Sequence, residues 1–230
     1  MNDTLVYEQY RSVGEINDAM IRVYNNMALA VVNSMLVSYV ISSSPALMAF
    51  LFTGLMKWIV IFAPIAAVFV VGYFIDKVSK SGALMLLHAF AALMGMSFSM
   101  IFVVYTMGSI VTAFMGAAIL FGTLSLYGYF TKRSLESMGQ FLFVGLIAVI
   151  IASIVNIFIG SSIMQMVISA VSIIIFLGLT AYDTQQIRIA VSVDSNGNEE
   201  VMGALTLYLD FINIFINLLQ LFGIGGKKDD

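Results

Sequence analysis

The sequence predicts an all-α membrane protein with seven transmembrane helices. Of its 230 residues, 61% are apolar and only 10% are charged, whereas a soluble domain has about 25% charged residues. The apolar residues also form long runs without a charge. Residues 58–75 come close to the length of about 20 residues that one span needs, and residues 23–56, 81–131 and 137–182 exceed it. The chain must therefore cross the bilayer several times.

Weak breaks divide the longer runs and set the order of the helices. The serines at 42–44 compete for backbone hydrogen bonds, and Pro45 disfavours helix at the residue before it, so the first helix ends there. Short Gly- and Ser-containing segments at 107–109 and 160–162 interrupt the two longest runs. We expect helices near residues 23–41, 54–75, 83–105, 109–130, 138–159, 163–183 and 204–222.

The sequence outside the spans predicts one membrane domain with a short arm and a short tail. We assign residues 1–22 to a cytoplasmic amphipathic arm, 23–222 to a single seven-helix domain and 223–230 to a charged tail. Ser12 and Glu15 have the spacing of a capping box, which starts a helix in the arm. The arm lacks the apolar core of a signal peptide.

Basic residues alternate between successive loops of this topology. The positive-inside rule then places the N-terminus in the cytoplasm of a multi-pass protein. Loops without charge are expected at 42–53, 106–108 and 160–162, and charged loops at 76–80, 131–137 and 184–203.

Composition excludes several classes of function. The chain contains no cysteine and a single histidine, which excludes disulfides, thiolate catalysis and Fe–S clusters and disfavours a zinc site. The formal net charge of −3 provides no basic surface for nucleic acid. We therefore expect no bound cofactor and no nucleic-acid partner.

Four ionisable side chains fall inside the predicted spans, where each costs at least about 2.5–3.5 kcal/mol at a helix centre. Lys57 lies beside Trp58 near a helix end, and snorkelling to the interface explains both residues. His88 shares a face with small residues, which favours a packed histidine over one that handles protons, so it is a secondary candidate. Asp183 and Asp210 have no such simple explanation.

The last predicted helix carries a polar stripe. Thr206, Asp210, Asn213, Asn217 and Gln220 fall within about 80° of arc at 100° per residue, opposite a face of Leu, Ile and Phe. A face this polar cannot point to lipid, so the helix must lie in the bundle or line a watery path. We expect these side chains to line the pathway.

The helix ends favour a meeting between Asp183 and Asp210. Asp183 closes the predicted helix 163–183, and Asp210 follows soon after the start of the predicted helix 204–222, on the same side of the membrane. Two carboxylates in a poorly solvated site cannot both ionise readily and titrate as a unit. The deprotonated pair would suit Ca²⁺, for which protons compete. Two alternatives stay open: Asp183 as an interfacial residue in water, and Asp210 paired with a structural Lys or Arg.

Four segments resemble a known family. The strings at 205–223, 181–187, 22–25 and 90–99 resemble helices of the transmembrane Bax inhibitor motif family in its bacterial branch. The resemblance implies a cage of six helices around a central seventh helix. It also implies a pH-sensitive calcium leak whose sensor aspartates match Asp183 and Asp210.

The same resemblance implies two further features. Some members latch the sensor pair with an Arg near the end of the second helix. Residues 75–80 contain no Arg here, which leaves Lys77 as the candidate latch. Some bacterial relatives instead modulate a membrane-bound quality-control protease.

These observations favour a passive calcium channel gated by protonation of the aspartate pair, without enzymatic activity. The chain has no Walker A string or His-Glu-x-x-His zinc string, and it lacks the Gly-x-Gly-Asp of intramembrane aspartyl proteases before Asp210. The expected partners are the lipid bilayer, calcium and protons, in a bacterial inner (plasma) membrane. The alternative is a non-transporting regulator that binds a membrane quality-control protease or stress and cell-death machinery through residues 1–22 and 184–203.

Overall fold

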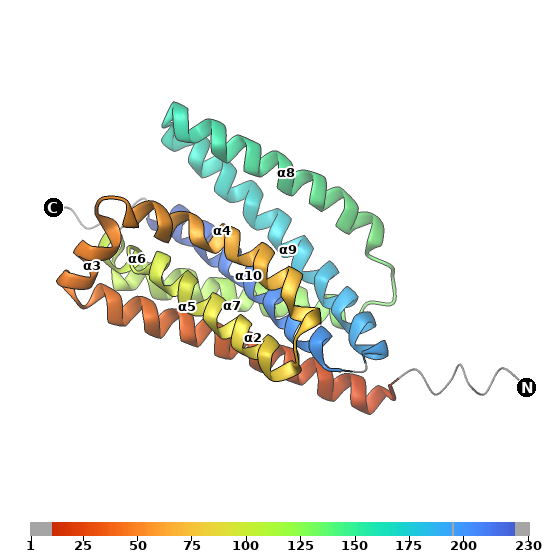
Figure 1. Cartoon of the computed structure of the whole chain (residues 1–230). Helices are drawn as coiled ribbons and strands as arrows, with labels where there is room; N and C mark the ends of the chain where they lie inside the picture. Colours follow the sequence, from red (N-terminus) through yellow and green to blue (C-terminus); the bar gives the residue numbers. More distant parts are fainter. Residues whose placement is uncertain (1–10, 195, 224–230) are drawn as a thin grey trace, which may run out of the picture. The chain divides into compact units, whose positions relative to one another are not determined.

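The computed structural model describes residues 11–194 and 196–223, and every regular element in these ranges is helical (Figure 1). The elements are α2 (Val13–Ser42), α3 (Pro45–Phe52), α4 (Met56–Phe74), the 3₁₀ helix η1 (Ile75–Lys77), α5 (Lys80–Phe98), α6 (Ile101–Val104), α7 (Met107–Phe130), α8 (Glu136–Ile159), α9 (Ser162–Val193) and α10 (Asn198–Phe222).

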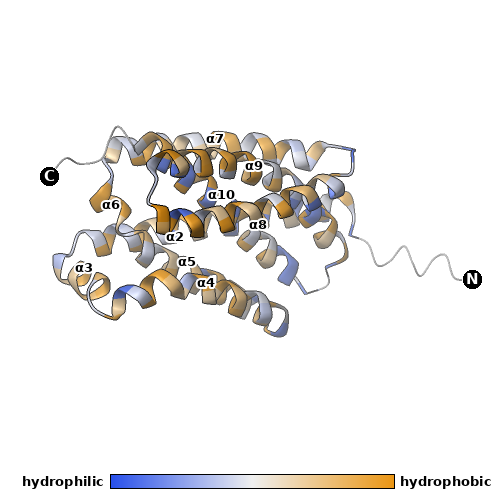
Figure 2. Cartoon of the chain, turned by 90° about the horizontal axis from the view of Figure 1, so that it is seen from above, coloured by the Kyte–Doolittle hydropathy of each residue, from blue (hydrophilic) through white to orange (hydrophobic). Residues whose placement is uncertain are grey.

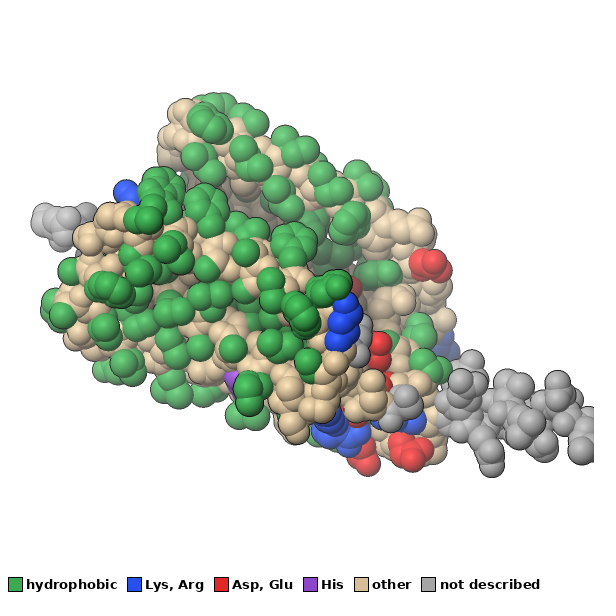
Figure 3. Space-filling view, in the orientation of Figure 1, with side chains coloured by type: hydrophobic (Ala, Val, Ile, Leu, Met, Phe, Trp, Pro, Cys, Tyr) green, Lys and Arg blue, Asp and Glu red, His purple; other side chains and the backbone are tan. Residues whose placement is uncertain are grey.

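Seven helical segments in the described residues are long and apolar enough to cross a membrane, with α5 and α6 counted as one segment. Hydrophobic residues run along these helices in Figure 2 and are spread over the face seen in Figure 3. The all-helical class and the seven predicted spans are therefore confirmed.

The chain forms two compact units. The first contains the described residues of Met1–Val104 and Ile187–Tyr208, and the second those of Tyr105–Gln186 and Leu209–Asp230. Helices α9 and α10 each contribute one part to each unit. The aspartates singled out above both belong to the second unit.

In the first unit, α2 begins at the predicted capping box. The backbone N–H of Glu15 donates to the Ser12 hydroxyl at 3.3 Å, and the N–H of Ser12 donates to the Glu15 carboxylate at 2.7 Å. From there α2 runs without a break to Ser42. The lead-in helix of the arm and the first span are therefore one helix.

Helices α2 and α5 approach closely along the small-residue face near His88. A Cβ atom on Gly95 would lie 2.6 Å from the Ser34 carbonyl oxygen, a distance that real Cβ atoms do not show. The Ser34 hydroxyl donates to the Ala91 carbonyl at 2.7 Å, and the Asn33 amide donates to the His88 carbonyl at 2.8 Å. This face therefore serves close helix packing.

The segment expected to be a bare loop after the first helix contains a short helix instead. Ser44 caps α3 by accepting a hydrogen bond from the N–H of Leu47 at 3.4 Å, and Pro45 occupies its first turn. Proline is well tolerated there because its missing N–H would have no helical partner. The break that ends α2 thus also starts α3.

The predicted loop at 184–203 is wrong, because α9 continues to Val193 and α10 already begins at Asn198. The Asp194 carboxylate closes the short turn by accepting from the N–H groups of Asn196 at 3.1 Å and Gly197 at 2.9 Å. Gly197 has φ +81°, a conformation that favours glycine. Hydropathy marks the apolar part of a helix and misses a polar continuation beyond it.

In the second unit, glycines let α9 pack closely against α7 and α8. A Cβ atom on Gly128 of α7 would clash with the Ala181 carbonyl of α9, and one on Gly139 of α8 would lie 2.5 Å from the Tyr182 ring. The two contacted residues of α9 come directly before Asp183 in the sequence. They fix the position from which its side chain reaches α10.

Candidate functional site

The structure brings the side chains of Asp183 and Asp210 into hydrogen-bonding contact between α9 and α10. Asp210 also contacts Thr180, which lies one turn before Asp183. The two carboxyl groups meet as the sequence predicts, although both lie well inside their helices and neither marks a helix end. Their role as a sensor stays a prediction.

Asp210 is buried without a compensating cation. Its residue is 4% exposed, and its Oδ2 atom has no hydrogen-bond partner among the described residues. Asp183 is half-buried. The ion pairs found in the described part of the chain include neither aspartate, so the alternative of a structural Lys or Arg partner for Asp210 finds no support there.

Aromatic packing holds the apolar side of α10 in place next to the pair. The ring of Phe211 meets the rings of Phe114 and Phe121 of α7 edge to face, with centroids 5.4 and 5.7 Å apart. Such pairs stabilise by about 0.5–1.5 kcal/mol beyond the area that they bury. Asp210 is therefore placed by a rigid neighbour in the chain.

The hydroxyls of α9 around Asp183 are engaged with neighbouring groups. Thr180 donates to the Phe176 carbonyl at 2.7 Å, and the buried hydroxyls of Thr184 and Ser125 lie 2.9 Å apart. This second hydrogen bond joins α9 to α7 on the side of Asp183. Small polar groups thus border the carboxyl pair.

The predicted pathway residues of α10 satisfy their donors within the helix. Thr206 donates to the Met202 carbonyl at 3.1 Å, Asn213 to the Leu209 carbonyl at 2.8 Å, and Asn217 to the Asn213 carbonyl at 2.8 Å. The amide oxygens of Asn213 and Asn217 accept from no described group. They remain available as polar ligands, and the pathway role of all three side chains stays a prediction.

Gln220 behaves differently, because it bonds to other helices. Its Oε1 atom accepts from Gln165 Nε2 at 2.8 Å and from the Ser169 hydroxyl at 2.7 Å, both on α9. Gln165 Oε1 in turn accepts from the Asn156 amide of α8 at 3.2 Å. We call these four residues the Gln220 cluster.

The sequence-based prediction included Asp183 but missed Gln165 and Ser169, two other polar residues of α9 that contact α10. Gln165, Ser169, Thr180 and Asp183 are spaced by 4, 11 and 3 residues, which places them on one side of a helix. The spacing was a usable signal. Neutral Gln and Ser side chains cost less in an apolar span than an acid does, so they do not mark a site by themselves.

The other predicted candidates have local contacts. The Lys77 ammonium lies 3.2 Å from the centre of the Tyr73 ring, and that of Lys57 lies 5.1 Å from the Trp58 ring centre. His88 is half-buried, and its carbonyl accepts the Asn33 bond described above. The latch role of Lys77 and the secondary role of His88 stay predictions.

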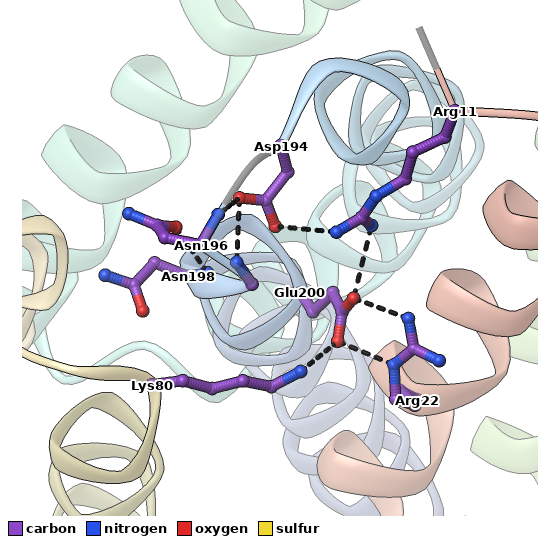
Figure 4. A network of polar contacts seen from close by, with 8 residues as sticks. Arg11, Arg22, Lys80, Asp194, Asn196, Asn198 and Glu200 are labelled. Carbon is purple, nitrogen blue, oxygen red and sulfur yellow. Dashed lines mark hydrogen bonds and ion pairs between the residues drawn. The ribbon is translucent and has the colours of Figure 1, made fainter. Parts of the chain in front are cut away.

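A network around Glu200 in the first unit was also missed. Arg11, Arg22 and Lys80 point toward the Glu200 carboxylate from different sides (Figure 4). The shortest donor distances are 3.2 Å for Arg11, 2.7 Å for Arg22 and 2.6 Å for Lys80. Arg11 also reaches Asp194 at 3.9 Å. No local spacing signals this network, since its members come from the segment before α2, from within α2, from the start of α5 and from the start of α10.

The described ranges contain no cluster of three or more side chains that could bind a metal ion. No group of three or more His, Asp or Glu side chains there has a metal-binding arrangement. A calcium ion at Asp183 and Asp210 would therefore take its remaining oxygens from hydroxyl, amide or water groups.

Comparison with known proteins shows the family. The family model described as "Inhibitor of apoptosis-promoting Bax1" matches residues 16–227. Inner membrane protein YbhL of Escherichia coli K12 is 39% identical over 211 residues, which cover 89% of this chain and 90% of the relative. An uncharacterized protein of Rickettsia prowazekii is 40% identical over 218 residues, with 91% and 90% covered. One from Deinococcus radiodurans is 35% identical over 225 residues, with 96% and 95% covered. With these matches over nearly its whole length and seven membrane-crossing helical segments, the chain belongs to the Bax inhibitor family of multi-pass membrane proteins.

Proposed function

We propose that this protein is a pH-sensitive passive calcium leak channel. In this proposal Asp183 and Asp210 bind protons or calcium and thereby gate a pathway along α10. The observation that carries the proposal is the contact between these two carboxyl groups, with Asp210 buried and one of its oxygens without a partner. Family membership supports it further, through the sensor positions that the resemblance implies.

Protonation controls this contact by simple chemistry. A carboxylate has no donor, so two carboxyl groups form a hydrogen bond only when one of them holds a proton. When both ionise, two negative charges stand at contact distance in a poorly solvated place and repel each other. The proton therefore decides whether α9 and α10 stay joined at this point, which makes α10 the element that can switch.

Calcium competes for the same oxygens. Ca²⁺ takes six to eight oxygen ligands, and the pair supplies a minority of them. The Thr180 hydroxyl of α9 and the amide oxygens of Asn213 and Asn217 of α10 can add neutral oxygens. A site with few charges favours passage, because conduction needs binding that is weak enough for the ion to leave.

The remaining parts of the proposal concern the setting of the channel. We propose that six helices surround α10. In its most apolar stretch of 18 residues, 67% is buried, whereas the share is 11% in the corresponding stretches of α4 and α8. The protein lies in a bacterial inner membrane, with its N-terminus on the cytoplasmic side. No cofactor and no catalysed reaction are involved, because the existing ion gradient drives the flux. The partners are the lipid bilayer, calcium and protons.

Calcium flux into proteoliposomes tests the proposal. The wild type is compared with Asp183→Asn and Asp210→Asn over a series of pH values, with a calcium-sensitive dye inside the vesicles. We expect a flux that depends on pH in the wild type and loses this dependence in both variants. Glu136→Gln removes an exposed carboxylate from the same unit and serves as the matched control. Equal, pH-independent flux in all samples would end the proposal.

The alternative, a non-transporting regulator of a membrane protease or of stress and cell-death machinery, has lost part of its basis. It relied on exposed residues at 184–203, where Asp194 is 9% exposed and Glu200 is 1% exposed. It also relied on the arm, where residues 1–10 lie outside the described ranges and Arg11 is engaged with Glu200. Deletion of residues 1–10 separates the two ideas, because the channel keeps its flux and the regulator loses its partner.

A further inference from the structure

We propose that the Gln220 cluster is a second closure of the pathway, in series with the carboxyl pair and independent of pH. The inference rests on the proposed function, because it assigns a role on the same polar face of α10. It concerns different residues, a different end of that face and a different chemistry.

The bonds of the cluster run between helices. The end of α10 is tied to α9 by the two hydrogen bonds that Gln220 Oε1 accepts from Gln165 and Ser169. Gln165 is tied to α8 by the bond from Asn156, whose own Oδ1 atom accepts from the N–H of Ser161 at 3.2 Å. The cluster therefore joins three helices where α8 and α10 end and α9 begins.

The polar face of α10 has the carboxyl pair near one end, the Gln220 cluster at the other end, and a polar stretch between them. Asp210 and Gln220 are about 15 Å apart along the helix axis at 1.5 Å per residue. Between them lie Asn213 and Asn217, whose donors bond only to their own helix. The polar stretch is thus bounded by an interhelical contact at each end. An ion that moves along it must pass both contacts.

The chemistry of the two contacts differs in one decisive respect. Amides and hydroxyls neither gain nor lose a proton in the pH range in which carboxyl groups titrate. The cluster must therefore present the same barrier at every pH, whereas the carboxyl pair changes. If the two contacts open independently, the flux is proportional to the product of their open probabilities. Weakening the constant contact then multiplies the flux by the same factor at every pH at which the carboxyl pair opens, and it leaves the midpoint of the pH profile in place.

Two serines of α9 provide a matched test. Both are buried, and each donates a 2.7 Å bond: Ser169 to Gln220 across the helix interface, Ser172 to the Ile168 carbonyl of its own helix. We expect Ser169→Ala to raise calcium flux at the permissive pH by about threefold, the factor that corresponds to about 0.6 kcal/mol for an interhelical hydrogen bond in a membrane. The midpoint should not move, and Ser172→Ala should match the wild type. Equal effects of both variants, or a shifted midpoint, would overturn the proposal.

A second measurement does not depend on calcium. The natural chain has no cysteine, so Asn217→Cys introduces a single thiol between the two contacts. Its modification by a charged, water-soluble thiol reagent is timed at the pH of lowest flux, with and without Gln220→Ala. We expect the second substitution to speed the modification at least threefold, by analogy with the loss of one interhelical bond. If Gln220→Ala leaves the modification rate unchanged, the second closure is overturned. If Gln220→Ala speeds the modification but the wild type carries no calcium flux, only the calcium proposal is overturned.

Discussion

Helix α10 carries two buried carboxylates in opposite surroundings. Glu200, near its start, has a side chain that is 1% exposed and accepts hydrogen bonds from two Arg and one Lys (Figure 4). Asp210, farther along, is 4% exposed and faces a second acid, with one oxygen that has no partner in the described ranges. The two acids are exposed to nearly the same small extent, but only Glu200 has cations beside it.

The difference separates a structural acid from a responsive one. A buried charge is costly unless it is paired, and a paired charge resists any change of its protonation. Glu200 therefore holds a fixed charge and anchors the start of α10 to α2 and α5. Asp210 faces a second acid and no cation in the described ranges, so no ion pair holds the charge of the Asp183–Asp210 pair fixed. One helix thus combines a fixed end with a switchable segment.

The largest expected effect comes from removal of the compensated acid. Glu200→Gln leaves three cations around a neutral group, and breaking a buried ion pair costs about 3–5 kcal/mol. We expect the lower end of that range, because the side chains of Arg22 and Lys80 are 46% and 38% exposed and can turn to water. Thermal unfolding in detergent measures the change, with the exposed Glu136→Gln as control. A variant as stable as the control would break the contrast.

Neutralising the uncompensated acid should have the opposite sign. Asp210→Asn removes like-charge repulsion and can still donate to Asp183, so we expect a gain of about 1 kcal/mol at mildly alkaline pH, as is common when a functional site is relieved of strain. At acidic pH both carboxyl groups are protonated in the wild type, and the gain should vanish. Thermal unfolding at the two pH values checks this. A destabilised variant at alkaline pH would show that Asp210 is structural like Glu200.

The sequence predicted the number of spans well, but it predicted the ends of the helices less well. Apolar runs report which residues lie in the bilayer, so the seven spans followed directly from them. They are silent on polar turns of helix outside it, which is why the continuation of α9 to Val193 and the early start of α10 at Asn198 were missed.

The site was predictable to the extent that its residues violate a local rule. Asp183 and Asp210 are acids inside apolar spans, and this alone marks them. Gln165 and Ser169 break no such rule, and their importance depends on the helix that they face. Glu200 was equally hidden, because its partners are far away in the sequence and only packing of α2, α5 and α10 brings them together.

The smallest expected effect distinguishes two neighbouring lysines. Lys80 donates to Glu200 at 2.6 Å, whereas Lys77 lies over the exposed Tyr73 ring. We expect Lys80→Met to cost about 0.5–1 kcal/mol, because a partly exposed ion pair is screened by water and two Arg side chains remain on Glu200. Lys77→Met should cost less than about 0.5 kcal/mol, as is usual for exposed positions. Unfolding midpoints compare the two variants directly, and added salt should reduce the cost of Lys80→Met only. If Lys77→Met instead changes the pH profile of calcium flux, Lys77 acts as the latch of the aspartate pair.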